Sequence, residues 1–265
     1  IMRSVKSINN QIFTGFYKDF GYWEKDAYGF LEFNSIVAQK EVKMFEDEQI
    51  WEIIELDGWV LFKSLERIYL YNLKTKSLKI LEGKGVLTKI SKVNDVVYFQ
   101  DLEQGLFKIE NGAPLLVSND AVLRNNKLAK IFYKEDKLFL LTQNKGFYFL
   151  KNGKLERWQV AANAYLKNKT IYSSEILSDG TMALGTISNG VVYITSTGEV
   201  DAQINQNLGL SNNTILSIFE DVDRNIWLGL DNGINLVNYS SPIKIFINQK
   251  DFLGTIYASV MHDGA

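Results

Sequence analysis

Residues 209–235 read GLSNNTILSIFEDVDRNIWLGLDNGIN, and this stretch decides the fold. Two apolar runs, 215–219 and 226–230, flank a polar turn at 221–225, which predicts two adjacent β-strands. The triplet Asp231-Asn232-Gly233 turns the chain again, because Asn and Gly tolerate the positive φ that tight hairpins require. A third strand at 234–237 completes the predicted antiparallel meander.

Weaker copies of this phrase recur along the chain. Turn-forming polar pairs begin at residues 9, 57, 94, 135, 179, 223 and 263, so successive pairs are 48, 37, 41, 44, 44 and 40 residues apart. A second turn, usually containing glycine, follows within each unit. A period near 40 residues with several short strands per unit is typical of β-propellers, in which each unit forms one four-stranded blade. One small sheet cannot bury both of its faces alone, so the blades stack on one another.

The copies predict an all-β fold: a β-propeller of four-stranded antiparallel blades, with about six blades present. We expect one domain over residues 1–254, with blades near 4–45, 50–82, 87–118, 128–160, 171–205 and 214–248. Residues 255–265 are expected to begin a further blade that is cut short. Ile50, Ile53 and Ile54 have helical spacing, but register with the other units and the β-branched content favour a strand there.

Composition narrows the function classes. The chain has 265 residues and a net charge of −2, so no basic surface is expected to attract nucleic acid. It contains no cysteine, which excludes disulfides and thiol chemistry. No run approaches the roughly 20 apolar residues of a membrane helix. Because the sequence begins with Ile1-Met2 and ends within a repeat unit, we expect it to be part of a longer protein.

Residues 209–235 closely resemble the two-component regulator propeller repeat. This repeat is found in the sensor ectodomains of Bacteroidetes hybrid two-component systems and of membrane-bound LuxR-type helix-turn-helix regulators. The segments FTGF at 13–16, FGYWE at 20–24 and LGTIYAS at 253–259 resemble phrases of the helix-turn-helix subgroup. The units at 171–203 and 214–246 are close to the repeat pattern, whereas those from 50 to 117 depart from it.

The resemblance implies a periplasmic sensor ectodomain of an inner-membrane protein rather than a catalyst. Such ectodomains carry tandem seven-bladed propellers, an immunoglobulin-like domain, a transmembrane helix and a cytoplasmic output module. The resemblance therefore implies a seven-bladed parent propeller, an oligosaccharide or other small ligand, and a homodimer of the intact protein. It implies no cofactor, no metal, no catalytic residue and no direct nucleic-acid binding by this segment.

The turn at Asp221, Asp223 and Asn225 has the alternating oxygen spacing that opens a calcium loop. The full loop also needs a glycine at its sixth position and an acid at its twelfth, where this chain has Ile226 and Asn232. We therefore favour an Asx-type structural turn over a metal site. With Trp227, the turn is also similar to the Asp-box of sialidases, which is itself a structural hairpin.

Tyr22 and Trp23 are the candidate ligand-binding residues. We expect them in a long polar connection between residues 16 and 30, where an exposed aromatic pair stacks on a sugar ring or a partner domain. The alternative is that the pair folds back and caps the first blade. Three other tryptophans, Trp51, Trp59 and Trp158, are interpreted as packing between blades.

Three functions remain open at this stage: a sensor segment, an interaction or dimerisation scaffold, and a propeller hydrolase or lyase. His262 beside Asp263 is the lone histidine, with no nucleophile phrase and no second histidine for a metal site. A propeller glycosidase would need two carboxylates facing each other. Carboxylates are abundant, but their sequence positions do not show such a pair.

Overall fold

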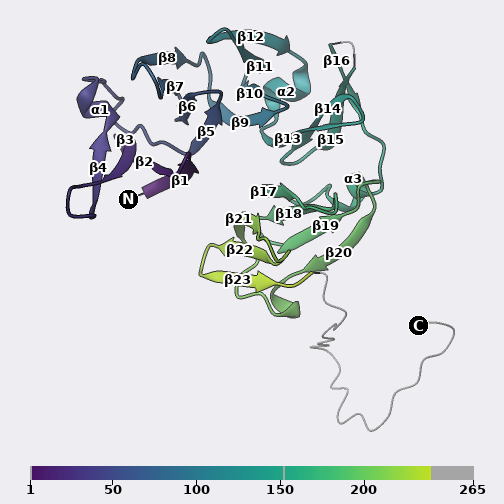
Figure 1. Ribbon diagram of the computed structural model, residues 1–265. Coiled ribbons are helices and arrows are strands. Elements are labelled where there is room, and N and C mark those ends of the chain that lie inside the picture. Colours follow the sequence, from purple (N-terminus) through teal and green to yellow (C-terminus); the bar gives the residue numbers. More distant parts are fainter. Residues whose placement is uncertain (1, 152, 240–265) are drawn as a thin grey trace, which may run out of the picture. The chain divides into compact units, whose positions relative to one another are not determined.

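A computed structural model describes residues 2–151 and 153–239 (Figure 1). The chain divides into two compact units, Ile1–Asn168 and Lys169–Ala265, and each is described by itself. Both units are built from small antiparallel sheets in which the strands follow one another in sequence order. We number these sheets 1 to 6 along the chain.

The first unit contains sheets 1 to 4, each with four strands. The strands are β1 (Met2–Ile8), β2 (Gln11–Phe16), β3 (Phe20–Lys25) and β4 (Leu31–Ser35) in sheet 1; β5 (Glu52–Leu56), β6 (Trp59–Lys63), β7 (Arg67–Asn72) and β8 (Leu78–Glu82) in sheet 2; β9 (Leu87–Val93), β10 (Val96–Asp101), β11 (Gly105–Glu110) and β12 (Ala113–Ser118) in sheet 3; and β13 (Leu128–Lys134), β14 (Lys137–Thr142), β15 (Gly146–Lys151) and β16 (Lys154–Arg157) in sheet 4. Short helices α1 (Ile36–Gln39), α2 (Ala121–Asn125) and α3 (Ala162–Tyr165) follow sheets 1, 3 and 4. The first strands of neighbouring sheets are in contact, β1 with β5, β5 with β9 and β9 with β13, so the four sheets share one inner edge.

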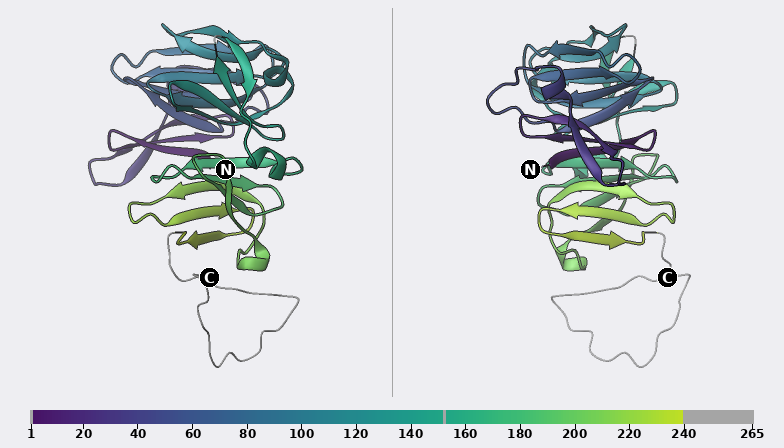
Figure 2. Two further views of the ribbon diagram at one scale, coloured as in Figure 1. Left: turned by 90° about the vertical axis from the view of Figure 1, so that its right-hand side faces the viewer. Right: turned by 60° about the vertical axis from the view of Figure 1, so that its left-hand side comes forward.

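The second unit contains sheets 5 and 6. Sheet 5 consists of β17 (Ile171–Ile176), β18 (Met182–Thr186), β19 (Val191–Ile194) and β20 (Val200–Ile204), and sheet 6 of β21 (Ile215–Glu220), β22 (Ile226–Leu230) and β23 (Ile234–Val237). The 3₁₀ turn η1 (Gln206–Leu208) joins the two sheets, and β17 contacts β21. Within each unit the sheets are stacked face to face (Figure 2).

The predicted all-β propeller fold is confirmed. Five of the six sheets have four antiparallel strands, and sheet 6 has three within the described residues. The segment with three isoleucines at helical spacing forms strand β5, as its register with the other units predicted. The expected strand at 255–265 and the end of the sixth unit lie outside the described residues. A single domain over 1–254 and a seven-bladed parent stay predictions.

Tight turns set the register inside the sheets. The β1–β2 turn has Asn9 and Asn10 at φ 49° and 61°, and the β9–β10 turn has Asn94 and Asp95 at 48° and 59°. Two successive positive φ values are typical of type I′ turns, whose twist matches that of the flanking strands. The polar pairs that marked the repeat in sequence therefore close the first hairpins of these sheets.

The core lies between sheets rather than inside one layer. Between sheets 1 and 2 it is aromatic: the ring centroids of Phe20 and Phe62 are 4.5 Å apart, and those of Phe20 and Tyr69 are 4.8 Å apart. Between sheets 5 and 6 it is mainly aliphatic, with buried residues such as Val191 and Ile215. This burial of facing sheets is the apolar contact that a single blade lacks.

The three tryptophans interpreted as packing residues differ in environment. The Trp158 ring makes edge contacts with Phe139 and Phe147 of its own sheet, at 5.2 and 5.5 Å between centroids, so its packing between blades stays a prediction. Trp51 is 38% exposed, and the guanidinium carbon of Arg3 lies 5.0 Å from its ring centroid. Trp51 thus contacts the neighbouring sheet, since Arg3 lies on β1, and its backbone N–H donates to the Lys63 carbonyl at 2.8 Å. Trp59 lines a cleft, described next.

Candidate functional site

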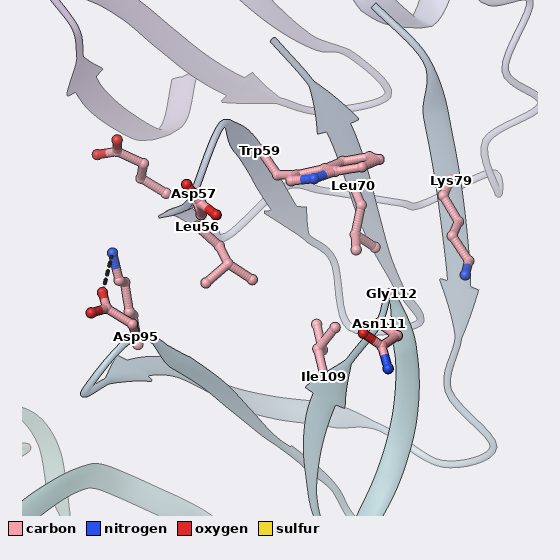
Figure 3. Close-up of a pocket in the computed structure, with 11 residues that line it drawn as sticks. Leu56, Asp57, Trp59, Leu70, Lys79, Asp95, Ile109, Asn111 and Gly112 are labelled. Atoms are coloured by element: carbon pink, nitrogen blue, oxygen red, sulfur yellow. Dashed lines mark ion pairs between the residues drawn. The ribbon is translucent and has the colours of Figure 1, made fainter. Parts of the chain in front are cut away.

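A cleft of 960 Å³ lies within the first unit, where the turns of sheets 2 and 3 approach each other (Figure 3). It is lined by residues of the β5–β6 hairpin, of β7 and β8, of the β9–β10 hairpin and of the β11–β12 turn. The lining residues are Glu55, Leu56, Asp57, Trp59, Leu70, Lys79, Lys92, Asp95, Ile109, Asn111 and Gly112. A volume of this size is in the range of small-molecule sites.

The apolar part of the cleft comes from both sheets. Leu56 and Trp59 are the paired residues on either side of the Asp57-Gly58 turn, so the hairpin register places both side chains at the cleft. Leu70 on β7 and Ile109 on β11 are buried members of the core between sheets 2 and 3. Trp59 is half-buried and keeps part of its ring accessible. An accessible indole above aliphatic side chains is a surface on which the flat apolar face of a ligand can stack.

The polar part of the cleft is of mixed charge. Three carboxylates (Glu55, Asp57 and Asp95) and two ammonium groups (Lys79 and Lys92) leave one net negative charge. The ammonium of Lys92 and the carboxylate of Asp95 form an ion pair at 3.1 Å, drawn as a dashed line in Figure 3. Figure 3 also shows Lys79 on the opposite side of the open space from Asp57 and Asp95. The rim therefore offers hydrogen-bond donors and acceptors without a strong net charge.

A partly buried ion triad links sheets 2 and 3 at the same junction. The Glu52 carboxylate on β5 lies 3.2 Å from Nζ of Lys63 on β6 and 2.9 Å from Nζ of Lys89 on β9. Lys63 is only 2% exposed, so its charge depends on this carboxylate. Burial opposes ionisation of Glu52, but the two ammonium groups outweigh it and lower the pKa of the carboxyl. The triad is a structural feature, because its members do not line the cleft.

A second buried carboxylate anchors the connection between sheets 1 and 2. Glu48 is 1% exposed and accepts hydrogen bonds from Ser64 Oγ at 2.7 Å, from the Tyr69 hydroxyl at 2.8 Å and from the Phe45 backbone N–H at 3.0 Å. Burial raises the pKa of the Tyr69 hydroxyl, which therefore stays a donor. The guanidinium of Arg67 lies 3.7 Å from the centre of the Phe45 ring and covers the network. These contacts fix the start of β7, the strand that carries Leu70 into the cleft.

The expected position of Tyr22 and Trp23 in a polar connection is wrong, because both lie in strand β3. Tyr22 is 7% exposed and packs in the core between sheets 1 and 2, near Phe13 and Tyr71. Trp23 points to the opposite face of sheet 1 and donates from Nε1 to Thr14 Oγ1 at 3.0 Å. Glycine at position 21 allows β4 to approach β3, because a Cβ there would lie 2.0 Å from the Asn34 carbonyl oxygen. Ligand binding through Trp23 stays a prediction.

The Asp221 turn has the hydrogen bonds of an Asx-type turn. Asp221 Oδ1 accepts from the backbone N–H groups of Asp223 and Asn225, both at 2.9 Å, and Oδ2 accepts from the Trp227 indole at 2.8 Å. The indole hydrogen bond, with the backbone donors, lowers the pKa of Asp221. At the next turn, Gly233 has φ 94° and its carbonyl accepts from the Leu230 N–H at 2.9 Å, which closes the Asp231-Asn232-Gly233 hairpin.

Among residues 2–151 and 153–239 no group of three His, Cys, Asp or Glu side chains is placed to hold a metal ion. His262 lies outside these residues. In the same ranges, no helix has the length and apolarity needed to cross a bilayer.

Comparisons with known proteins agree on the fold. No protein-family model matches the sequence, and no curated protein matches it. Among solved structures, the extracellular domain of BT4673 from B. thetaiotaomicron, described as a one-component or hybrid two-component system, is similar with a TM-score of 0.67 and 18% identity. The match covers 91% of this chain and 33% of that chain, so this chain spans about a third of its length.

Solved structures of unrelated proteins are similar too. The AfRom2 CNH domain has a TM-score of 0.64 at 11% identity, over 93% of this chain and 84% of that one. A chain of the mitotic checkpoint complex has a TM-score of 0.64 at 9% identity, over 87% of this chain and 71% of that one. At these identities the likeness shows a shared propeller fold, which extracellular domains of signalling proteins also have.

Proposed function

We propose that this chain is a ligand-sensing propeller segment of an extracytoplasmic receptor, and that the cleft between sheets 2 and 3 binds the ligand. The observation that carries the proposal is the combination of an accessible indole, Trp59, with a polar rim of low net charge in one cleft. The propeller fold shared with the extracellular domain of BT4673 supports a receptor role. In such a receptor, ligand binding would bias the position of attached domains.

The cleft chemistry favours a neutral, hydroxyl-rich ligand. A sugar ring has an apolar face that stacks on indole and an edge of hydroxyl groups that pair with carboxylates and ammonium groups. The one net negative charge of the rim disfavours polyanions such as nucleic acid. Together with the resemblance to two-component regulator propellers, this supports glycan fragments as the ligand class.

A hydrolase is less well supported than a sensor. Lys92 and Asp95 form an ion pair at 3.1 Å within their own sheet, so both groups already have a partner. The expected homodimer, immunoglobulin-like domain and periplasmic location belong to the whole receptor, and they stay predictions.

The test is calorimetric titration of the full chain with a panel of neutral oligosaccharides of different linkages. Binding with a dissociation constant that Trp59→Ala weakens by roughly tenfold or more would support the proposal, since one stacking contact contributes about 1–2 kcal/mol. Trp51→Ala is the matched control, because Trp51 is exposed and lies outside the cleft.

Either of two results would contradict the proposal. One is the absence of heat and of any rise in melting temperature with every sugar of the panel, because a ligand of the folded state must stabilise it. The other is binding that Trp59→Ala leaves unchanged while Trp51→Ala removes it.

A further inference from the structure

One structural device recurs in three of the sheets. In sheets 1, 5 and 6 the first strand has a bulge followed by a serine, and a glycine faces that serine on the second strand. The pairs are Ser4 with Gly15, Ser173 with Gly185 and Ser217 with Gly229. We call each pair a Ser–Gly socket.

Two of the three sockets hold an isoleucine from the next sheet. Ser4 Oγ donates to the Ile50 carbonyl at 2.8 Å, and Ser173 Oγ donates to the Ile215 carbonyl at 2.9 Å. A Cβ on Gly15 would lie 2.4 Å from Cγ2 of Ile50, and one on Gly185 would lie 2.8 Å from Cγ2 of Ile215. The glycine is therefore required because the isoleucine side chain fills the space where its own side chain would be.

The third socket is open in the described part of the chain. Among the described residues, the three atoms nearest to a Cβ on Gly229 all belong to Ser217, at 2.3, 3.6 and 3.9 Å, and Ser217 is exposed. The same features that receive Ile50 and Ile215 are thus present on sheet 6 with no isoleucine from another sheet against them.

The sheet face around the socket shows the same contrast. In sheet 1, Phe20 pairs with Gly15 across the hairpin, and Phe13 pairs with Tyr22 beside them. Sheet 2 covers these three side chains: Phe13, Phe20 and Tyr22 are 0%, 0% and 7% exposed. The equivalent positions of sheet 5, Ala183, Val191 and Tyr193, are 0% exposed beneath sheet 6.

In sheet 6 the equivalent positions are Trp227, Ile234 and Leu236, which are 42%, 68% and 53% exposed. Phe219, paired with Trp227, adds a fourth side chain that is 63% exposed. An apolar sheet face of this kind is expected to be covered by a partner.

The sequence supplies one segment that matches the occupants of the other sockets. Residues 255–258 read TIYA, which is similar in sequence to TIYS at 170–173 and to TILS at 214–217. Ile256 lies 19 residues after Val237, the last residue of β23. Ile215 lies 21 residues after Ile194, the last residue of β19. The chain is therefore long enough to bring Ile256 to its socket in the same way.

We propose that the open face of sheet 6, formed by Ser217, Phe219, Trp227, Gly229, Ile234 and Leu236, is the docking surface for residues 255–259, with Ile256 in the Ser217–Gly229 socket. This inference rests on the repeated geometry of the sheets and does not depend on the ligand cleft. The alternative occupants, a second copy of the chain or no occupant, are outcomes of the tests below.

The first test is hydrogen exchange on the full chain. The proposal predicts that backbone amides of residues 256–258 exchange at least about tenfold more slowly than an unstructured peptide, because a docked strand opens only transiently. Gly229→Val fills the socket and is predicted to abolish this protection. Exchange at the unprotected rate in the wild type, or protection that survives Gly229→Val, would overturn the proposal.

The second test uses the absence of cysteine from the chain. The double variant Ser217→Cys/Ile256→Cys is predicted to form an intramolecular disulfide under mild oxidation, because the serine borders the space that the isoleucine fills. Val222→Cys/Ile256→Cys is the control, since Val222 is 98% exposed in the neighbouring turn and is expected not to cross-link. A disulfide-linked dimer would assign the face to a second copy, and no disulfide at all would mean that residue 256 lies elsewhere; each overturns the proposal.

Discussion

Two junctions between sheets differ in the side chains that lie where the sheets meet. One joins sheets 2 and 3 in the first unit, and the other joins sheets 5 and 6 in the second unit. At the 5–6 junction a Ser–Gly socket holds Ile215. At the equivalent strand positions of the 2–3 junction, Glu52 and Lys63 form an ion triad with Lys89. The repeated sheet frame thus tolerates either small residues or paired charges where two blades meet.

The two junctions also differ at the end where the first hairpins turn. Ser178 of sheet 5 donates from its backbone N–H and its hydroxyl to the Glu220 carboxylate of sheet 6, at 2.6 and 2.9 Å. At the 2–3 junction Lys92 instead pairs with Asp95 of its own sheet. This end lies open as the cleft that contains Trp59. A cleft for a ligand can therefore form at a blade junction that lacks hydrogen bonds like those between Ser178 and Glu220.

The largest effect is expected from Glu52→Gln. This change leaves Lys63 buried without its carboxylate, and we expect a loss of about 3 kcal/mol in the free energy of unfolding. Urea denaturation measures it. The double variant Glu52→Leu/Lys63→Met is the control: it replaces the buried ammonium together with its carboxylate, and the Lys89 ammonium that stays is on a side chain 25% exposed to water, so most of the stability is expected to return. A loss below about 1 kcal/mol in the single variant would show that the triad does not hold this junction.

Gly185→Ala tests the other junction. The added Cβ would lie 2.2 Å from Ser173 Oγ and 2.8 Å from two atoms of Ile215, so we expect a loss of about 2 kcal/mol from overpacking. Adding Ser173→Ala removes the first clash and should recover part of that loss, but not the part caused by Ile215. Unchanged stability in Gly185→Ala, measured by urea denaturation, would contradict the packing account.

The pH dependence of stability separates the triad from the socket. The pKa of Glu52 is lowered in the folded state from its ordinary value of 4.5. The resulting stabilisation is therefore fully present above pH 4.5 and is lost as the pH falls through the lower, folded pKa. We expect Glu52→Gln to flatten the stability curve below pH 4.5, whereas Gly185→Ala should shift the curve without changing its slope. Equal slopes for wild type and Glu52→Gln in acid denaturation would disagree with this assignment.

The smallest effect is expected from Glu220→Ala. It removes the two hydrogen bonds from Ser178, which is exposed, so the expected loss is about 1 kcal/mol. Hydrogen exchange should rise in the turn at 178–180 and stay unchanged in the socket around Gly185. An unaltered turn would mean that Ser178 and Glu220 do not tie sheets 5 and 6 together.

The features that could be predicted from the sequence are those that repeat along it, namely the strands and the turns between them. The strands at 215–219, 226–230 and 234–237 followed from alternating apolar runs between turns, and the fold followed from their spacing. The cleft was not predictable, because its lining comes from turns near residues 57, 95 and 111 that only the packing of sheets 2 and 3 brings together. The ion triad was not predictable either, since the sequence does not show that the Glu52 carboxylate lies between the ammonium groups of Lys63 and Lys89.

The most direct test of the account is a comparison of hydrogen exchange in the full chain with and without a saturating neutral oligosaccharide. We predict slower exchange at the turns around residues 57–58, 94–95 and 111–112, which border the cleft, and no change at 178–180, where the 5–6 junction is tied. Slower exchange at 178–180 with none at the three cleft turns, or no change anywhere with every sugar tried, would contradict the assignment of the cleft as the ligand site.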